Sequence, residues 1–400
     1  MAEPIKDAKK KTFTVAGQYV EEIRFEQKRP DPIVRASTST AAFIGRTKSG
    51  PCNKAVLVNN FGEFENIFGG FISEPRQYLA YAVDLFFKNG GDRAYIVRAE
   101  EMNQNDKAPM RISVVKRLFK RQDAMDIDAA LSALEKADDA SIIAAPGICG
   151  EDVYEKLIVH CSKMKCRFAI LDPPSGCSVD QVIKIRSAEM ISGNGMAATY
   201  YPWLQIADPV TKKNITVPPS GAVAGVYANS DNRNGVHKAP ANISLASVMG
   251  LETNISTQDQ EHLNVKNINA IRAFTGKGFV VWGARTISDD PDLRYINVRR
   301  LLLHLEQSIY NSTKWVLTEP NDGNLWAKFK TIIEDFLTGA WREGMLTGAK
   351  PEDAFYVKCG LGQTMTAEDI MNGRMIAEIG VAPSRPAEFV RICFSYDIEK

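Results

Sequence analysis

The fold class follows from residues 127–171, which read IDAALSALEKADDASIIAAPGICGEDVYEKLIVHCSKMKCRFAIL. Apolar residues recur with helical spacing in Ile127–Lys136 and again in Asp152–Lys165. Each stretch leads into a short, almost wholly apolar run, first Ser141–Ala145 and then Arg167–Leu171. Helices that alternate with short apolar strands are typical of βαβ units. This stretch therefore predicts an α/β fold with a largely parallel sheet that helices cover on both faces.

The same alternation extends in both directions. Downstream, a helical pattern at Val179–Glu189 leads to a strand pattern at Ala197–Tyr201. Upstream, a helix whose first turn contains Pro75 ends at Asn89-Gly90-Gly91, and the strand Ala94–Ala99 follows. The sequence thus predicts repeated strand–helix units from about residue 75 to residue 201.

The second half of the chain is less uniform. Residues 202–260 are rich in Pro, Gly and Asn, which predicts a connecting region. After it we expect a buried strand at Gly278–Gly283 and two amphipathic helices, at Tyr295–Tyr310 and Asn324–Gly344. A chain of 400 residues also exceeds the usual size of one domain, so we expect two.

Composition excludes several classes of protein. The formal net charge is +1, which argues against a nucleic-acid-binding protein, because binding phosphates takes a basic surplus. With 44% hydrophobic residues the chain can build a core, and it has no apolar run long enough for a transmembrane helix. Residues 1–12 hold four lysines and no apolar segment, so we expect a flexible basic tail and no signal peptide.

The cysteines and histidines do not predict a metal or cofactor site. Seven cysteines without a secretory signal indicate reduced thiols. The densest group comprises His160, Cys161, Cys166 and Cys177. Its spacing is wider than that of paired zinc ligands, and Cys161 falls on the apolar face of an expected helix. His304 lies among leucines in another helix, where a packed histidine is expected, and His237 has no partner nearby in the sequence.

The sequence does not match the usual catalytic motifs either. Gly276-Lys277-Gly278 does not fit the P-loop pattern GxxxxGK[ST]. Gly195-Met196-Ala197 is similar to the small-residue turn around a subtilisin-type serine, but the serine itself is missing. We therefore expect no catalytic residues and no enzyme.

Both ends of the chain carry amphipathic strand patterns, at residues 13–25 and 390–398. A strand with one apolar face must pair and bury that face, which leaves two alternatives. The strands join the sheet of their own subunit, or each adds to a sheet of a neighbouring copy and makes the chain a link in a polymer. The residues expected to form these strands are Phe13, Val15, Tyr19, Ile23, Val390, Ile392, Phe394, Tyr396 and Ile398.

The helix expected at Asn324–Gly344 has a polar face opposite its apolar stripe. Lys328, Asp335 and Arg342 are spaced seven residues apart and fall on that polar face. Such charges either are simply solvated or form a contact site.

Many stretches of the chain after residue 12 resemble the sheath subunits of contractile phage tails, R-type bacteriocins and extracellular contractile injection systems. GQYVEEI at 17–23 is similar to the family's Pro-Gly-Val-Tyr-Val-Glu-Glu opening, from which Ala16 and Gln18 depart. The order and density of the later blocks carry the resemblance. These blocks are TAAFIG (40–45), FENIFGG (64–70), LAYAVDLFFKNGGDRAYIVR (79–98), YYPW (200–203), VPPSGAVAGVYA (217–228), DNRNGVHKAPAN (231–242), NINAI (267–271), VWGART (281–286), RYINVRR (294–300) and PAEF (386–389).

The resemblance implies a structural protein that polymerises as stacked hexameric rings around an inner tube and contracts to drive the tube through a target membrane. It implies a sheath fold with a subtilisin-like sheet topology, without the catalytic residues, and extended N- and C-terminal strand arms. The implied units are a flexible tail at 1–12, an outer α/β domain at 31–244, and an inner domain made of 13–30 and 245–400.

The resemblance also implies the partners. They are further copies of the chain, an inner tube protein, baseplate and cap proteins, and sheath paralogues, with no nucleic-acid contact and no direct membrane insertion. Because the family's tube contact comes from the C-terminal domain, Lys328, Asp335 and Arg342 are the candidate tube-contact residues. Assembly is expected in the bacterial cytoplasm, with possible release of the particle. The alternative is a soluble α/β enzyme or binding module that does not polymerise.

Overall fold

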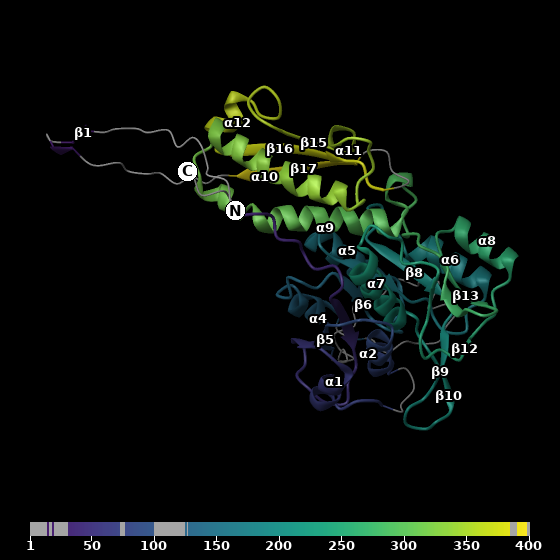
Figure 1. Cartoon of the computed structure of the whole chain (residues 1–400). Helices are drawn as coiled ribbons and strands as arrows, with labels where there is room; N and C mark the ends of the chain where they lie inside the picture. The colour runs from purple at the N-terminus through teal and green to yellow at the C-terminus, as the bar shows by residue number, and fades with distance from the viewer. Residues whose placement is uncertain are drawn as a thin grey trace, which may run out of the picture.

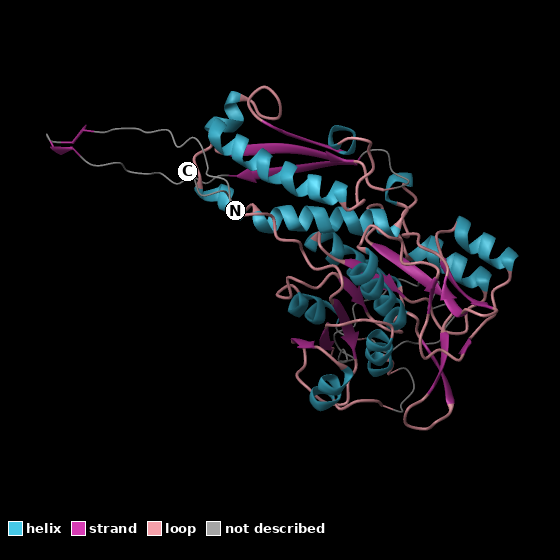
Figure 2. Cartoon of the chain, viewed as in Figure 1, coloured by secondary structure: helices cyan, strands magenta, loops and turns pink. Residues whose placement is uncertain are grey.

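The computed structural model describes residues 31–72, 77–99, 125 and 127–384, together with the backbone of strands at 14–15, 18–19 and 390–397. The described residues form a larger body built on a nine-stranded sheet and a smaller body built on a three-stranded sheet. A long helix, α9 (Ile296–Ser312), lies between them (Figures 1 and 2).

The nine-stranded sheet is mainly parallel. Its order is β11-β14-β13-β8-β7-β6-β3-β5-β4, and the six strands from β13 to β5 run parallel to one another. β4, β14 and β11 are antiparallel to their neighbours. The parallel-rich α/β fold predicted from the sequence is therefore confirmed, while the subtilisin-like topology stays a prediction. The strands are β3 (Ala41–Gly45), β4 (Ala55–Val58), β5 (Ala94–Arg98), β6 (Ile142–Ala144), β7 (Phe168–Leu171), β8 (Ala197–Tyr201), β11 (Ile243–Ser244), β13 (Asn269–Phe274) and β14 (Gly278–Val281).

Helices cover both faces of this sheet, which explains why its central strands are wholly apolar. α2 (Leu79–Lys88) and α7 (Ser220–Asn234) pack on one face. The helices of the other face lie close to the predicted positions, because long amphipathic stretches carry the clearest periodicity. They are α4 (Ile127–Leu134), α5 (Glu151–Met164) and α6 (Val179–Glu189). α8 (Thr257–Val265), which was not predicted, packs on β13 and α6, and α1 (Phe61–Phe68) packs against β4 and α2.

The prediction of a connecting region at 202–260 is wrong. This stretch contains the helix α7 and a separate three-stranded sheet. The strands of that sheet are β9 (Leu204–Ala207), β10 (Asn214–Val217) and the short β12 (Gly250–Leu251). α7 is buried on nearly all sides from Ser220 to Ala228, so its sequence has no amphipathic period. Its small residues serve close packing against α2.

Two glycines of α7 allow the backbone of α2 to come close. A Cβ at Gly221 would lie 2.4 Å from the Cα and carbonyl oxygen of Ala82, and one at Gly225 would lie 2.5 Å from the carbonyl oxygen of Phe86. We expect Gly225→Ala to lower the free energy of unfolding by about 1–3 kcal/mol, because the helices must separate. The measurement is urea unfolding followed by circular dichroism.

Gly339→Ala is the matched control. Gly339 lies in the helix α10 (Gly323–Arg342), and a Cβ added there meets no atom within 4 Å. This variant should gain up to about 1 kcal/mol from the higher helix propensity of alanine. Equal stability changes for the two variants would contradict the close-packing account of α7.

The smaller body places α10 between α9 and a three-stranded antiparallel sheet (Figure 1). Its core combines the apolar stripe of α10, including Phe329, Ile333 and Leu337, with residues of α9 and of the sheet. The other elements are η3 (Lys314–Thr318), α11 (Pro351–Ala354), β15 (Phe355–Cys359), α12 (Ala367–Met371), β16 (Arg374–Val381) and β17 (Val390–Asp397).

The change from one core to the other does not coincide with the expected boundary at residue 244. β13 and β14 belong to the nine-stranded sheet, so residues up to about 287 pack with the larger core. From Val298 onward most apolar residues pack with the smaller core. Pattern alone did not reveal this, because the pairing of β13 with β8 joins residues about 70 positions apart.

Candidate functional site: an assembly surface on the smaller body

The structure places the predicted C-terminal strand in the sheet of its own chain. β17 pairs antiparallel with β16, from Val390 opposite Val381 to Asp397 opposite Arg374. The sheet order is β15-β16-β17, so β17 is an edge strand, and no other described strand pairs with its outer edge. The predicted positions Val390, Ile392, Phe394 and Tyr396 lie in β17, and Ile398 lies outside the described residues.

The N-terminal pattern gives a different result. β1 (Thr14–Val15) pairs antiparallel with β2 (Gln18–Tyr19), so the chain reverses between Val15 and Gln18. The prediction of one continuous strand over 13–25 is therefore wrong at this point. Val15 and Tyr19 lie in these short strands, whereas Phe13 and Ile23 lie outside the described residues.

The predicted polar face of α10 is on the surface. Asp335 and Arg342 are exposed. Lys328 is 3.7 Å from a carboxylate oxygen of Glu319 and lies over the ring of Trp315, 4.2 Å from its centroid. The three charges are thus available to a partner, although Lys328 already has contacts within its own chain.

A buried ion pair joins the two bodies. Arg300 of α9 donates two hydrogen bonds to the carboxylate of Asp231 in α7, at 3.0 and 2.6 Å. The guanidinium also donates to the carbonyl of Thr38 (2.8 Å) and lies over the ring of Tyr227. The side chains of Arg300 and Asp231 are 3% and 1% exposed. Burial raises the pKa of the Asp231 carboxyl, and Arg300 opposes that rise.

α9 contributes to both cores. Ile296 and Leu303 pack with the larger core, whereas Val298, Leu302 and Leu305 pack with the smaller one. A helix shared in this way, together with the buried Arg300–Asp231 pair, fixes the smaller body against the larger one. Sequence analysis missed this junction because Asp231 and Arg300 lie 69 residues apart.

The chain reaches the larger sheet as an extended strap, residues 33–38, that runs along α9. The backbone N–H groups of Val34 and Ala36 donate to the hydroxyls of Ser312 and Ser308, both at 2.9 Å. Arg35 forms a bidentate ion pair with Glu343, just beyond the end of α10. These contacts hold the strap against the C-terminal half of α9.

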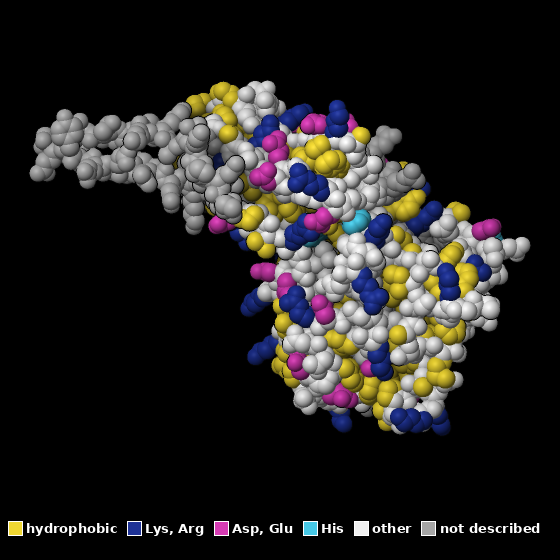
Figure 3. All heavy atoms as spheres, viewed as in Figure 1, with side chains coloured by type: hydrophobic (Ala, Val, Ile, Leu, Met, Phe, Trp, Pro, Cys, Tyr) yellow, Lys and Arg dark blue, Asp and Glu magenta, His cyan; other side chains and the backbone are white. Residues whose placement is uncertain are grey.

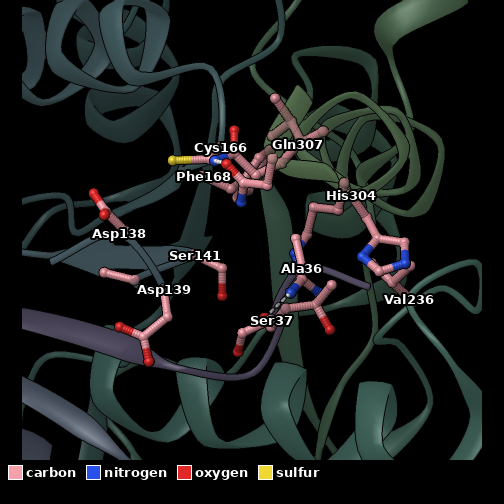
Figure 4. Close-up of a pocket in the computed structure, with 15 residues that line it drawn as sticks. Ala36, Ser37, Asp138, Asp139, Ser141, Cys166, Phe168, Val236, His304 and Gln307 are labelled. Carbon is pink, nitrogen blue, oxygen red and sulfur yellow. Dashed lines mark hydrogen bonds between the residues drawn. The ribbon is translucent and has the colours of Figure 1, made fainter. Parts of the chain in front are cut away.

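A small cavity of about 140 Å³ lies between the strap, α9 and the start of β6. Figure 4 shows Asp138 and Asp139 on one side of it, Ser141 between, and His304 with the strap residues Ala36 and Ser37 on the other. His304 is 8% exposed, and its Nδ1 has no hydrogen-bond partner among the described residues. Burial, and then the charge of Arg35, lower the pKa of His304 to about 4.

His304 predicts a loss of stability in acid. Its pKa in the folded chain lies below the ordinary value of 6.5, so the unfolded chain takes up the proton first as the pH falls. The stabilising contribution is complete above pH 6.5 and is lost between pH 6.5 and about 4, by up to about 3 kcal/mol. Urea unfolding at pH 7 and pH 4.5 should show a smaller acid loss for His304→Gln than for the unchanged chain.

The unchanged chain must be compared with His304→Gln, because other buried groups also change protonation between pH 7 and pH 4. Burial also lowers the pKa of His160 to about 4, which adds to the acid loss. Burial raises the pKa of Asp172 to about 7, so its contribution to stability falls as the pH rises from 4 to 7. If the variant and the unchanged chain lose the same stability between pH 7 and pH 4.5, His304 takes up its proton at the same pH in the folded and the unfolded chain.

One buried serine–carboxylate contact has a structural role. Ser220 Oγ donates to Asp172 Oδ2 at 2.6 Å, and the N–H groups of Ser220 and Gly147 donate to the same carboxyl. Asp172 thereby holds the first turn of α7. A nucleophilic serine needs a base, usually histidine, and access to substrate. Ser220 and Asp172 are 0% and 2% exposed, so the contact anchors a helix.

The described residues contain no group of three or more His, Cys, Asp or Glu that could hold a metal ion. Cys161 is fully buried in the larger core, as its place on the apolar face of a helix predicted. No described helix is both long and apolar enough to cross a membrane.

Two family models match the chain in succession. The phage tail sheath protein central domain matches residues 121–287, and the phage tail sheath C-terminal domain matches residues 288–394. A curated relative is the tail sheath protein of Vibrio phage KVP40, which is 25% identical over 229 residues. That match covers 56% of this chain but only about a third of the relative.

Solved structures match over nearly the whole chain. The sheath complex of the extracellular contractile injection system PVC, in the contracted state, is 30% identical with a TM-score of 0.74, covering 96% of this chain and 97% of that one. The helical sheath of the anti-feeding prophage in the contracted state is 28% identical with a TM-score of 0.76, covering 96% and 99%. These are structural sheath proteins rather than enzymes, the class expected from the sequence. The chain belongs to the phage tail sheath family.

Proposed function

We propose that this chain is the structural subunit of a contractile sheath, which polymerises as stacked hexameric rings around an inner tube and contracts to drive that tube through a target membrane. The observation that carries the proposal is the match over 96% of the chain, at 30% identity, to an injection-system sheath in its contracted state. The same match favours this function over the alternative of a soluble α/β enzyme or binding module that does not polymerise.

The energy for contraction is stored when the sheath assembles in an extended, metastable form. Each subunit releases a few kcal/mol when it reburies surface in the contracted form, a gap typical of bistable packings. The shared helix α9 and the buried Arg300–Asp231 pair support movement of each subunit as one body. Contacts between subunits then change, while the strand arms keep neighbours linked.

In this proposal the N-terminal arm extends from an inner unit that surrounds the tube, whereas the C-terminal strand β17 stays paired with β16 of its own chain. The inner unit comprises residues 13–30 and the smaller body, and the larger body forms the outer unit. The packing of the cores supports a division near residue 288 rather than at 245. Pairing between strands suits the linking role, because main-chain hydrogen bonds depend little on how the subunit bodies are oriented.

Contraction can be tested directly on assembled particles. The chain is co-expressed with the inner tube protein of its own gene cluster, and cryo-electron microscopy records the particles before and after brief exposure to mild urea. The proposal predicts two sheath forms with equal numbers of subunits, one long and narrow and the other short and wide. A single form that only dissolves in urea would contradict it.

The tube contact gives a further prediction. Changing Lys328, Asp335 and Arg342 together to Ala should weaken binding of the sheath to the tube, because complementary charges contribute to the contact. The loss should be greatest at low salt, where charges are least screened. Co-sedimentation of sheath with preformed tubes at 50 and 500 mM NaCl measures it, with an expected reduction of about tenfold or more at 50 mM, equivalent to roughly 1.4 kcal/mol.

The control changes Lys54, Lys213 and Glu65, three exposed residues of the larger body with the same summed charge, to Ala. This variant should bind tubes as the unchanged chain does. Equal binding by the two triple variants at both salt concentrations would remove the α10 face from the tube contact.

The remaining partners follow from the same proposal. Baseplate proteins start the sheath, cap proteins end it, and sheath paralogues occupy special rings. The particle assembles in the bacterial cytoplasm and is released from the cell. Neither nucleic acid nor lipid contacts the subunit directly.

A further inference from the structure

We propose that the strap, residues 33–38, is an acid-sensitive latch. It lies on α9 near neutral pH and detaches when His304 takes up a proton, while both cores stay folded. Detachment frees six residues, which span roughly 20 Å when extended. The latch belongs to the single subunit, so it needs no neighbouring copy and goes beyond the proposed function.

The first observation is that few contacts hold the strap. The N–H groups of Val34 and Ala36 donate to hydroxyls of α9, and Arg35 forms an ion pair with Glu343. The side chains of that pair are 44% and 45% exposed, and an ion pair as exposed as this one stabilises weakly. Segments with few buried contacts open before a core does. The strap can therefore detach without unfolding either body.

The second observation is a buried histidine that is bonded to the strap through Ser308. The Ser308 hydroxyl donates to the carbonyl of His304 at 2.6 Å and accepts the N–H of Ala36 at 2.9 Å. The imidazole lines the cavity beside the strap residues Ala36 and Ser37 (Figure 4), and its Nδ1 has no hydrogen-bond partner in the described part of the chain. A proton added to this ring places a positive charge in a largely buried site.

Most of the charge around His304 opposes that proton. Burial is the main cause, and Arg35 of the strap and Arg300 of α9 add to it, whereas the carboxylate of Glu343 favours the proton. Together they hold the pKa of His304 at about 4 while the strap is in place. Because Arg35 lies on the strap itself, detachment removes both this charge and part of the burial.

The cavity gives protons a route to the ring. Asp138 is exposed and lies across the cavity from His304, so solvent can enter on that side. Asp139 lies beside Asp138 but already has an ion pair and a hydrogen bond to other residues. Cys166 also lines the cavity, and burial raises the pKa of its thiol, so the thiol stays uncharged in acid. His304 can therefore be protonated without unfolding of the chain.

His237, which follows α7, is a second histidine at this junction. Burial lowers its pKa, and its charge interacts with the carboxylates of Glu343 and Asp231. A proton on His237 adds a positive charge that competes with Arg35 for Glu343. Figure 3 shows basic, acidic and histidine side chains together on the surface where the two bodies meet. Acid therefore weakens the hold on the strap from this side as well.

The pKa of His304 couples detachment to pH. It is about 4 with the strap attached and returns toward the ordinary 6.5 when the strap leaves, so the attached form is fully favoured above pH 6.5 and loses that advantage as the pH falls to 4. The ratio of detached to attached strap should rise by up to about twentyfold between pH 7 and pH 5. The hydrogen bond from Arg35 keeps the pKa of Glu343 below its ordinary 4.5, so their ion pair persists at pH 5.

Hydrogen exchange followed by mass spectrometry tests the latch on the full chain. The N–H groups of Val34 and Ala36 are protected by the hydroxyls of α9 only while the strap is attached. After correction for the intrinsic effect of pH on exchange, peptides covering 33–38 should lose protection by about tenfold to twentyfold between pH 7 and pH 5. Peptides covering β7, in the larger core, should keep their protection.

Two variants identify the group that takes up the proton. His304→Gln has no ionisable ring and should remove most of the pH dependence of the strap. His160→Gln is the matched control, because burial also lowers the pKa of His160 to about 4 but this residue does not line the cavity. This control should respond to pH as the unchanged chain does.

Three results would overturn the latch. In the unchanged chain they are a change in strap protection of less than about twofold between pH 7 and pH 5, or an equal loss of protection in β7. The third is a response to pH in His304→Gln equal to that of the unchanged chain. The first two need no variant, so the test holds even where a substitution prevents folding.

Discussion

Deletion of residues 1–25 is expected to abolish polymerisation while leaving a folded monomer. In the part of the chain that the structure describes, both cores are built from residues 33 onward, so the circular dichroism and the unfolding midpoint should stay close to those of the full chain. Polymerisation should fail because the strand that links one copy to the next is gone. Sedimentation and negative-stain electron microscopy measure the loss.

Deletion of residues 1–12 alone is the control for this experiment. It removes the lysine-rich tail but keeps the amphipathic residues 13–25, and should polymerise normally. Full-length, regular sheaths from the 1–25 deletion would contradict the arm model.

Arg300→Met is expected to give the largest stability loss of any single variant considered for this chain. The substitution leaves the carboxylate of Asp231, 1% exposed, without its ionic partner and frees the carbonyl of Thr38. Removing one partner of a buried ion pair costs about 3–5 kcal/mol, because the other charge stays buried. Urea unfolding of the variant should show that loss.

Two controls separate the buried charge from simple loss of packing. Arg300→Met combined with Asp231→Leu should recover much of the stability, since an apolar pair carries no buried charge. Lys156→Met breaks an exposed ion pair with Asp128 and should change stability by no more than about 1 kcal/mol. A loss in the double variant equal to that of Arg300→Met would show that Asp231 has little part in the effect.

How well each element could be predicted from the sequence depended on which of its faces are buried. α5, α6 and β8 followed their predictions closely, because half-buried helices and wholly buried strands have recognisable patterns. α7 was missed because burial on nearly all sides removes the period and its glycines suggest a loop. Local pattern also could not reveal the reversal between Val15 and Gln18.

The candidate site was predictable only in part. The spacing of Lys328, Asp335 and Arg342 correctly placed them on the surface of α10, and the C-terminal alternation correctly placed β17. The open edge of β17, the strap along α9 and the Arg300–Asp231 pair depend on contacts between residues far apart in the chain. Those contacts follow from the tertiary fold and leave no trace in local sequence.

Electron microscopy of the purified chain, alone and mixed with its inner tube protein, tests the central claim most directly. The account predicts hollow helical sheaths with six-fold end views, formed by the chain alone or once the tube is added as a template. Only small, discrete particles under both conditions would contradict the account and favour a subunit that does not polymerise.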